Sequence, residues 1–149
     1  MAFRRKGVGR DMVSPSPNAD KTILFADEDG ILQKFVAALL TRSGYNLIAA
    51  IDGKDALQKA SGFVGTIHLL LAGVEMPGMT GIELAIQLNR ERPDTKILLI
   101  SGLDSGMLVL NNGWQFLPKP FMANMLQERI RDFLSEQPSP EEPVPGALT

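Results

Sequence analysis

Five short apolar segments recur along the chain, and each is nearly continuous rather than alternating with polar residues. Parallel strands that are covered on both faces have this pattern, whereas strands with one face in water alternate. The segments are TILFA (22–26), NLIAA (46–50), IHLLLA (67–72), KILLI (96–100) and WQFL (114–117). We therefore predict five buried strands in one parallel sheet.

Between these segments, apolar residues recur at the spacing of a helix face. The predicted stripes are Ile31, Leu32, Phe35, Val36, Leu39 and Leu40; Ala56, Leu57 and Ala60; Ile82, Ala85 and Ile86; and Met122, Met125, Leu126, Ile130, Phe133 and Leu134. Strand and helix thus alternate, which is typical of a doubly wound α/β sheet. The weak unit is SGLDSGMLVLNNGW (101–114), where NNG interrupts the pattern, so the fourth helix is predicted to be short or irregular.

Both ends of the chain lack apolar periodicity. Residues 1–20 are predicted to form a flexible basic arm, residues 21–135 one domain, and residues 136–149 a disordered tail rich in Pro and Glu. The basic residues of the arm are Arg4, Arg5, Lys6 and Arg10. Contact of this arm with nucleic acid or an acidic partner is one interpretation, but a solvated arm is favoured. No DNA-binding or enzymatic output domain is expected after the last helix.

Composition excludes several classes of function. The 149 residues are 44% hydrophobic and 21% charged, with a formal net charge of −2 that gives no strong basic field for nucleic acid. There is no cysteine and only one histidine, so disulfides, thiolate metal sites and multi-histidine metal sites are excluded. No apolar run approaches the length of a membrane span, and residues 1–20 do not resemble a secretory signal. A cytoplasmic protein is expected.

Polar residues gather where the predicted strands end. Asp27 and Glu28 follow the first strand, Ser101 ends the fourth, and Lys119 follows the fifth. Ligands of an open parallel sheet bind outside the carboxyl ends of its strands, so these side chains are expected to share one crevice. Paired carboxylates suit Mg²⁺, while a hydroxyl and an ammonium suit the oxygens of a phosphoryl group. The third strand, however, ends in Gly73, which provides no nucleophile.

Five segments carry a family resemblance. ILFADEDG, AIDGKDAL, VEMPGMTGIEL, ILLISG and FLPKPF resemble the successive motifs of a response-regulator receiver domain, the phosphoacceptor module of two-component signalling. The resemblance covers roughly residues 21–135. It implies a flavodoxin-like (βα)₅ fold with a parallel sheet in the order 2-1-3-4-5.

The resemblance also implies a role for each residue of the crevice. Asp27 and Glu28 correspond to the acidic pair that binds Mg²⁺. Ser101 and Lys119 correspond to the groups that contact the phosphoryl group, and Phe116 to the aromatic switch residue. A cis peptide bond before Pro120 is a further implication, and a histidine kinase or a downstream signalling protein is the implied partner.

Two features depart from the family. Gly73 stands where the family has the aspartate that accepts phosphate, so no acyl phosphate can form at this position. The missing carboxylate is also expected to weaken Mg²⁺ binding and to leave Lys119 to turn to Asp27 or to solvent. The interval from Ser101 to Lys119 is shorter than the family's by about one helical turn. That shortening puts the family's usual dimer face in question.

Alternatives remain open at this point. Gly73 is either a backbone requirement of a sharp turn or the mark of a lost reactive group. Another carboxylate, from among Asp27, Glu28, Asp29 and Glu75, could replace the acceptor, but a shifted nucleophile would lose its in-line approach. The favoured function is therefore a receiver that binds protein partners and is not an enzyme. Phosphotransfer through another carboxylate is the second reading, and a nucleic-acid binder that uses the basic arm is the third.

Two further residues receive structural interpretations. His68 lies inside an apolar run, and we predict a hydrogen-bonded structural histidine rather than a metal ligand or proton shuttle. Trp114 is expected to be a partly exposed packing residue.

Overall fold

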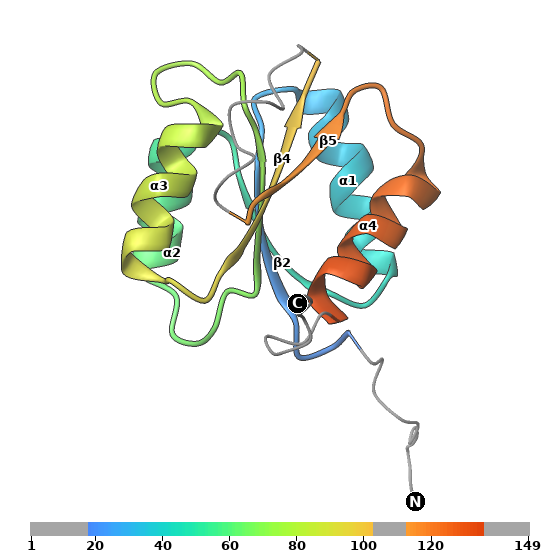
Figure 1. The fold of residues 1–149 in the computed structure, drawn as a ribbon, viewed down its shortest axis with the longest axis horizontal. Helices are drawn as coiled ribbons and strands as arrows, with labels where there is room; N and C mark the ends of the chain where they lie inside the picture. The colour runs from blue at the N-terminus through green and yellow to red at the C-terminus, as the bar shows by residue number, and fades with distance from the viewer. Residues whose placement is uncertain (1–17, 103–112, 136–149) are drawn as a thin grey trace, which may run out of the picture.

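A five-stranded parallel sheet forms the centre of the protein (Figure 1). The computed structural model describes residues 18–102 and 113–135. The strands are β1 (Thr22–Ala26), β2 (Asn46–Ala50), β3 (Leu69–Gly73), β4 (Lys96–Ser101) and β5 (Gln115–Pro118). They pair in the order β2-β1-β3-β4-β5, and every pairing is parallel. The predicted doubly wound sheet and its strand order are confirmed.

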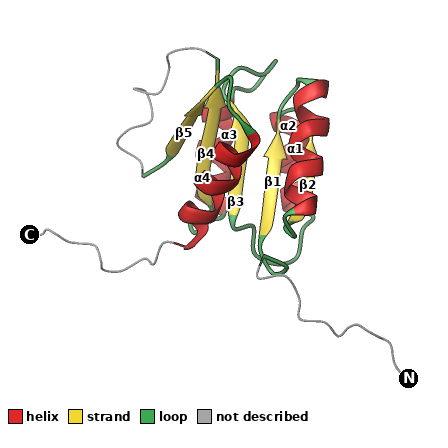
Figure 2. Ribbon diagram, turned by 90° about the vertical axis from the view of Figure 1, so that its right-hand side faces the viewer, coloured by secondary structure: helices red, strands yellow, loops and turns green. Residues whose placement is uncertain are grey.

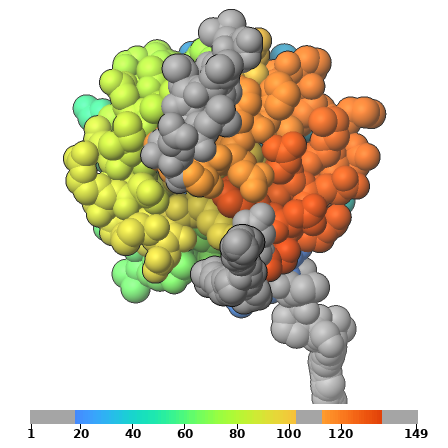
Figure 3. Space-filling view, in the orientation of Figure 1, coloured from blue at the N-terminus to red at the C-terminus, as the bar shows by residue number. Residues whose placement is uncertain are grey.

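Helices cover both faces of this sheet. Those in the described residues are α1 (Gly30–Arg42), α2 (Gly53–Ser61), α3 (Gly81–Glu91) and α4 (Ala123–Ser135). Helices α1 and α4 lie on one face, and α2 and α3 lie on the other (Figures 1 and 2). Figure 3 shows residues of α3 and α4 on opposite sides of the molecule in the same view. The short helix predicted within residues 103–113 falls, except for Gly113, on residues that lie outside the described ranges.

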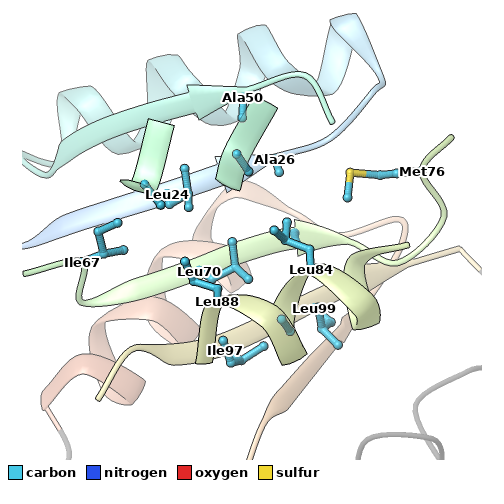
Figure 4. Packing of buried hydrophobic residues seen from close by; sticks show 14 of the residues in the cluster. Leu24, Ala26, Ala50, Ile67, Leu70, Met76, Leu84, Leu88, Ile97 and Leu99 are labelled. Atoms are coloured by element: carbon cyan, nitrogen blue, oxygen red, sulfur yellow. The ribbon is translucent and has the colours of Figure 1, made fainter. Parts of the chain in front are cut away.

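The core consists of two clusters, one on each side of the sheet. Strands β1 and β3 are buried at all five of their positions, as their continuous apolar sequences predict. The cluster under α2 and α3 contains Leu24, Leu70 and Leu99 (Figure 4), and the cluster under α1 and α4 contains Phe25 and Leu71. Alternate residues of one strand therefore supply opposite faces of the sheet.

Several apolar residues assigned to helix stripes do not face the sheet. Ile31 is 84% exposed and Phe35 is 41% exposed, and Ile86, Met122 and Met125 are exposed as well. The residues that do face it are Val36, Leu39 and Leu40 on α1; Leu84, Ala85 and Leu88 on α3; and Leu126, Ile130 and Phe133 on α4. The predicted stripes of α1 and α4 were too wide, because a sheet covers only the middle of a helix face and flanking positions remain in solvent. On α3 the predicted stripe was misplaced, because it omitted Leu84 and Leu88. Met122 precedes the first residue of α4.

Helices α1, α2 and α3 begin near the carboxyl edge of the sheet with side-chain caps. Asp29 accepts hydrogen bonds from the backbone N–H groups of Ile31 and Leu32, and Asp52 caps α2. At α3, Thr80 and Glu83 form a reciprocal capping box. These caps fix the loops that surround the ends of the strands. Across the two described ranges, no helix has the length and apolar character needed to cross a membrane.

Candidate functional site

The polar residues predicted to share a crevice do meet at the carboxyl edge of the sheet. Asp27 directly follows β1, Gly73 ends β3, Ser101 ends β4, and Lys119 directly follows β5. Strand pairing aligns them, because Gly73 is level with Ile100 on β4 and Ser101 is level with Pro118 on β5. The backbone N–H of Lys119 also donates to the carbonyl oxygen of Ser101 at 2.8 Å.

Asp27 is the most deeply placed charged group of the site. Its side chain is 2% exposed, and its Oδ1 accepts a hydrogen bond of 2.9 Å from the backbone N–H of Asp29. Its Oδ2 is buried and accepts no hydrogen bond. The Nζ of Lys119 lies 3.7 Å from that oxygen. Asp27 and Lys119 thus form a half-buried ion pair that leaves one carboxylate oxygen incompletely satisfied.

The Asp27 carboxylate lies where a side chain at position 73 would begin. A Cβ on Gly73 would collide with Asp27 Oδ2 and would lie only 3.1 Å from Asp27 Cγ. The backbone of Gly73 does not have a positive φ angle, unlike Gly44 or Gly78. Glycine is therefore not required at position 73 by backbone conformation. What the absent side chain provides is space, and Asp27 occupies it.

The acidic pair predicted to bind Mg²⁺ is divided by this arrangement. Asp27 turns inward to Lys119, whereas Glu28 is exposed and Asp29 serves as the cap of α1. No group of three or more His, Cys, Asp or Glu side chains in residues 18–102 and 113–135 is arranged to hold a metal ion. Of the predicted ligands, only Asp27 offers a buried oxygen without a hydrogen bond.

Ser101 is engaged by a residue that the sequence analysis considered only as a substitute nucleophile. Ser101 is fully buried, and its hydroxyl donates a hydrogen bond to Oε2 of Glu75. Glu75 lies in the loop after β3 and is itself exposed. The sequence carried no signal for this contact, because it depends on the path of the loop after Gly73.

The remaining predicted residues have structural partners. The peptide bond between Lys119 and Pro120 is cis, as the family resemblance implied. Phe116 is half-buried against the cluster under α2 and α3, and its carbonyl oxygen accepts a hydrogen bond from Arg129. Its role as a switch residue stays a prediction. Trp114 is half-buried against the same cluster, as expected.

His68 has the structural role that its position indicated. Its Nδ1 accepts a hydrogen bond of 3.0 Å from the backbone N–H of Thr22. Burial lowers the pKa of His68 below its usual value of 6.5, and the positive charge of Lys21 lowers the pKa further. The neutral form of the ring, which can accept at Nδ1, is therefore favoured in the folded protein.

An apolar groove of about 290 Å³ adjoins the site. The first turns of α1 and the segment from Lys119 to Phe121 line it, and the rings of Phe35 and Phe121 lie 6.5 Å apart between their centroids. Sequence reasoning missed this groove because it assigned Ile31 and Phe35 to the core.

Comparisons with known proteins agree with the fold. The family model for the response regulator receiver domain matches residues 23–131. The sensor kinase CckA of Brucella abortus is 31% identical over 119 residues, which are 77% of this chain and 12% of that kinase. The transcriptional regulatory protein CpxR of Escherichia coli K12 is 34% identical over 116 residues, 75% of this chain and 48% of that regulator. The chain thus spans half or less of these two relatives.

A solved structure gives the same result. The chain resembles a response regulator of Thermotoga maritima, solved in complex with Mg²⁺–BeF, with a TM-score of 0.67 and 26% sequence identity. The alignment covers 76% of this chain and 98% of that one. Three findings agree. The sheet is parallel and has this strand order, the family model matches most of the chain, and a carboxylate, a hydroxyl and an ammonium group lie at one edge of the sheet. The chain belongs to the response regulator receiver domain family of two-component signalling.

Proposed function

We propose that this receiver acts by contact with another signalling protein and is not phosphorylated at the family's usual position. The proposal rests on one observation, which is that another group occupies the space beside Gly73. Gly73 has no carboxylate, and the space that its side chain would enter holds the carboxylate of Asp27. The partner would be a histidine kinase or a downstream protein of a two-component pathway.

The chemistry of an acyl phosphate supports this proposal. Such a bond forms when a carboxylate oxygen attacks phosphorus in line from about 3 Å, with the charged groups already in place. Asp27 is 2% exposed and paired with Lys119, so a phosphoryl donor has little access to it. Glu75 is exposed but holds the Ser101 hydroxyl. A domain without a placed nucleophile would not catalyse its own phosphorylation, so we infer that it is not an enzyme.

Mg²⁺ binding is proposed to be weak. Asp27 Oδ2 is a suitable oxygen ligand, because it is buried and accepts no hydrogen bond. Mg²⁺ needs one or two carboxylates in a strict octahedral geometry, and Asp27 and Glu28 would be the candidates here. The ammonium of Lys119, 3.7 Å from the same oxygen, opposes a second cation. Titration with Mg²⁺ should show weak binding that Asp27→Ala abolishes, and tight binding that survives Asp27→Ala would contradict this.

The experiment for the main proposal is intact-mass measurement after incubation with acetyl phosphate and Mg²⁺. A receiver that retains the acceptor aspartate serves as the positive control for the donor. The mass of this chain should stay unchanged while the control gains one phosphoryl group. A phosphorylated product would overturn the proposal. Fragmentation that placed the group on Asp27 or Glu75 would then support phosphotransfer through another carboxylate.

A further inference from the structure

The ammonium of Lys119 and the hydroxyl of Ser101 could both bind an oxyanion, but each contacts a carboxylate of the protein instead. Lys119 pairs with Asp27, and the Ser101 hydroxyl donates to Glu75. Asp27 lies in the space beside Gly73. Glu75 comes from the loop after β3, so its contact with Ser101 is a separate feature of the site.

We propose that Glu75 is a built-in occupant of the Ser101 end of the site. Its carboxylate accepts the hydrogen bond from Ser101 that an incoming oxyanion would otherwise accept. It thereby holds the carboxyl end of β4 in one conformation. This inference rests on the proposed function, since it explains how a receiver without an acceptor keeps a defined surface for its partner. Glu75 is a positioning residue in this account.

The loop after β3 is anchored on both sides of Glu75. Val74 and Met76 are both buried, at 8% exposure each, and the backbone N–H of Val74 donates to the carbonyl oxygen of Ile100 at 2.8 Å. The N–H of Gly81, the first residue of α3, donates to the carbonyl oxygen of Val74 at 3.0 Å. The backbone at residue 75 therefore has a fixed position, and its side chain needs only a rotamer choice to reach Ser101.

Burial and charge indicate that the contact between Glu75 and Ser101 affects both the end of β4 and the approach of an oxyanion. Ser101 is fully buried, so loss of the hydrogen bond that its hydroxyl donates to Glu75 would weaken the end of β4. A hydrogen bond to an ionised acceptor is roughly twice as strong as a neutral one. The negative charge of Glu75 also repels any oxyanion that approaches Ser101. Two features of this site thus oppose an incoming phosphoryl group, and restoring a carboxylate at position 73 would change only one of them.

The first test measures amide hydrogen exchange at Lys119, whose N–H donates to the carbonyl oxygen of Ser101. Glu75→Ala should speed this exchange about tenfold, because the end of β4 loses an anchor. Glu75→Gln, whose amide oxygen can still accept from Ser101, should show a smaller change. Glu91→Ala, at the exposed far end of α3, is the matched control and should show none. Equal exchange in the parent and in Glu75→Ala would overturn the proposal.

The second test compares Gly73→Asp with the double variant Gly73→Asp/Glu75→Ala during incubation with acetyl phosphate and Mg²⁺. The double variant should gain a phosphoryl group at least about tenfold faster, because Glu75 no longer competes with the phosphoryl oxygens for the Ser101 hydroxyl and no longer repels them. Equal rates in the two variants, zero included, would overturn the role of Glu75. Phosphorylation of the parent chain in the same experiment would instead overturn the proposed function, so the two failures are distinguishable.

Discussion

The interior of β3 and its carboxyl end follow different constraints. Residues 69–72 are buried apolar side chains that pair with β1 on one side and β4 on the other. Gly73 pairs only with β4, and beyond it the chain turns through Val74 and Glu75. The interior is a fully buried parallel strand, whereas the end offers no side chain to the site.

This difference shows that the fold and the chemistry of a receiver are separable. The sheet is held by the burial of strand side chains, to which the residue at position 73 contributes no apolar area. The apolar packing of the sheet therefore does not need a side chain at position 73. In this structure the neighbouring groups pair with one another: Asp27 lies in the space beside Gly73, Lys119 pairs with Asp27, and the Ser101 hydroxyl donates to Glu75.

The largest effect is expected in the strand interior. Leu71 is fully buried in the cluster under α1 and α4. Leu71→Ala removes that side chain and leaves a cavity, so it should lower the free energy of unfolding by about 2–5 kcal/mol. Val64→Ala, at a position that is 96% exposed, should change it by less than about 0.5 kcal/mol. Urea denaturation measures both, and a similar loss in the two variants would show that the interior does not carry the fold.

A smaller effect is expected at the end of the strand. Gly73→Ala places a Cβ against the Asp27 carboxylate, which must then move away from Lys119. We expect a loss of about 1–3 kcal/mol in the free energy of unfolding, as for other overpacked sites. In an Asp27→Ala background the added methyl group has room, so the same substitution should cost almost nothing.

The double-mutant cycle of these two substitutions isolates the contact. A coupling energy of about 1 kcal/mol or more is expected for groups in direct contact. Additive effects of Gly73→Ala and Asp27→Ala would show that Asp27 does not occupy the space at position 73.

The smallest effect concerns His68, which lies just before the interior of β3. Its pKa is lowered in the folded state, mainly by burial, so the unfolded chain binds a proton more readily. The resulting stability is present above the unfolded pKa, near 6.5, and is lost as the pH falls below that value. Denaturation midpoints should therefore decrease between neutral pH and mildly acidic pH.

The control for this prediction is His68→Asn, whose side-chain oxygen can accept from Thr22 without titrating in that range. Its midpoint should be less sensitive to pH over the same interval. An identical pH dependence in both proteins would assign the effect to other groups.

The sequence was sufficient to predict the strands, because continuous apolar segments have few other uses in a chain of this size. It was less reliable for the helices. Ile31, Phe35 and Ile86 continue the apolar spacing but lie at the flank of a helix face, and spacing alone does not show how much of the face a sheet covers. The capping box at Thr80 and Glu83 was present in the sequence as T-x-x-E and could have been identified there.

For the site, the sequence predicted which residues meet but not how they pair. Strand ends and parallel topology bring Asp27, Ser101 and Lys119 together without any knowledge of side chains. The side-chain conformation of Asp27 depends on the absence of a side chain at position 73. The contact of Glu75 with Ser101 depends on the path of the loop after β3. Both are properties of three-dimensional packing, so only the structure reveals them.

The most direct measurement of the central claim is a nuclear magnetic resonance titration with Mg²⁺, followed by beryllofluoride, a phosphoryl mimic. The amide signals of Gly73, Ser101 and Lys119 report on the site. Mg²⁺ alone should shift them only weakly, and beryllofluoride should add nothing, because no acceptor carboxylate is free and Glu75 holds Ser101. Saturable further shifts at Ser101 and Lys119 on addition of beryllofluoride would contradict the account.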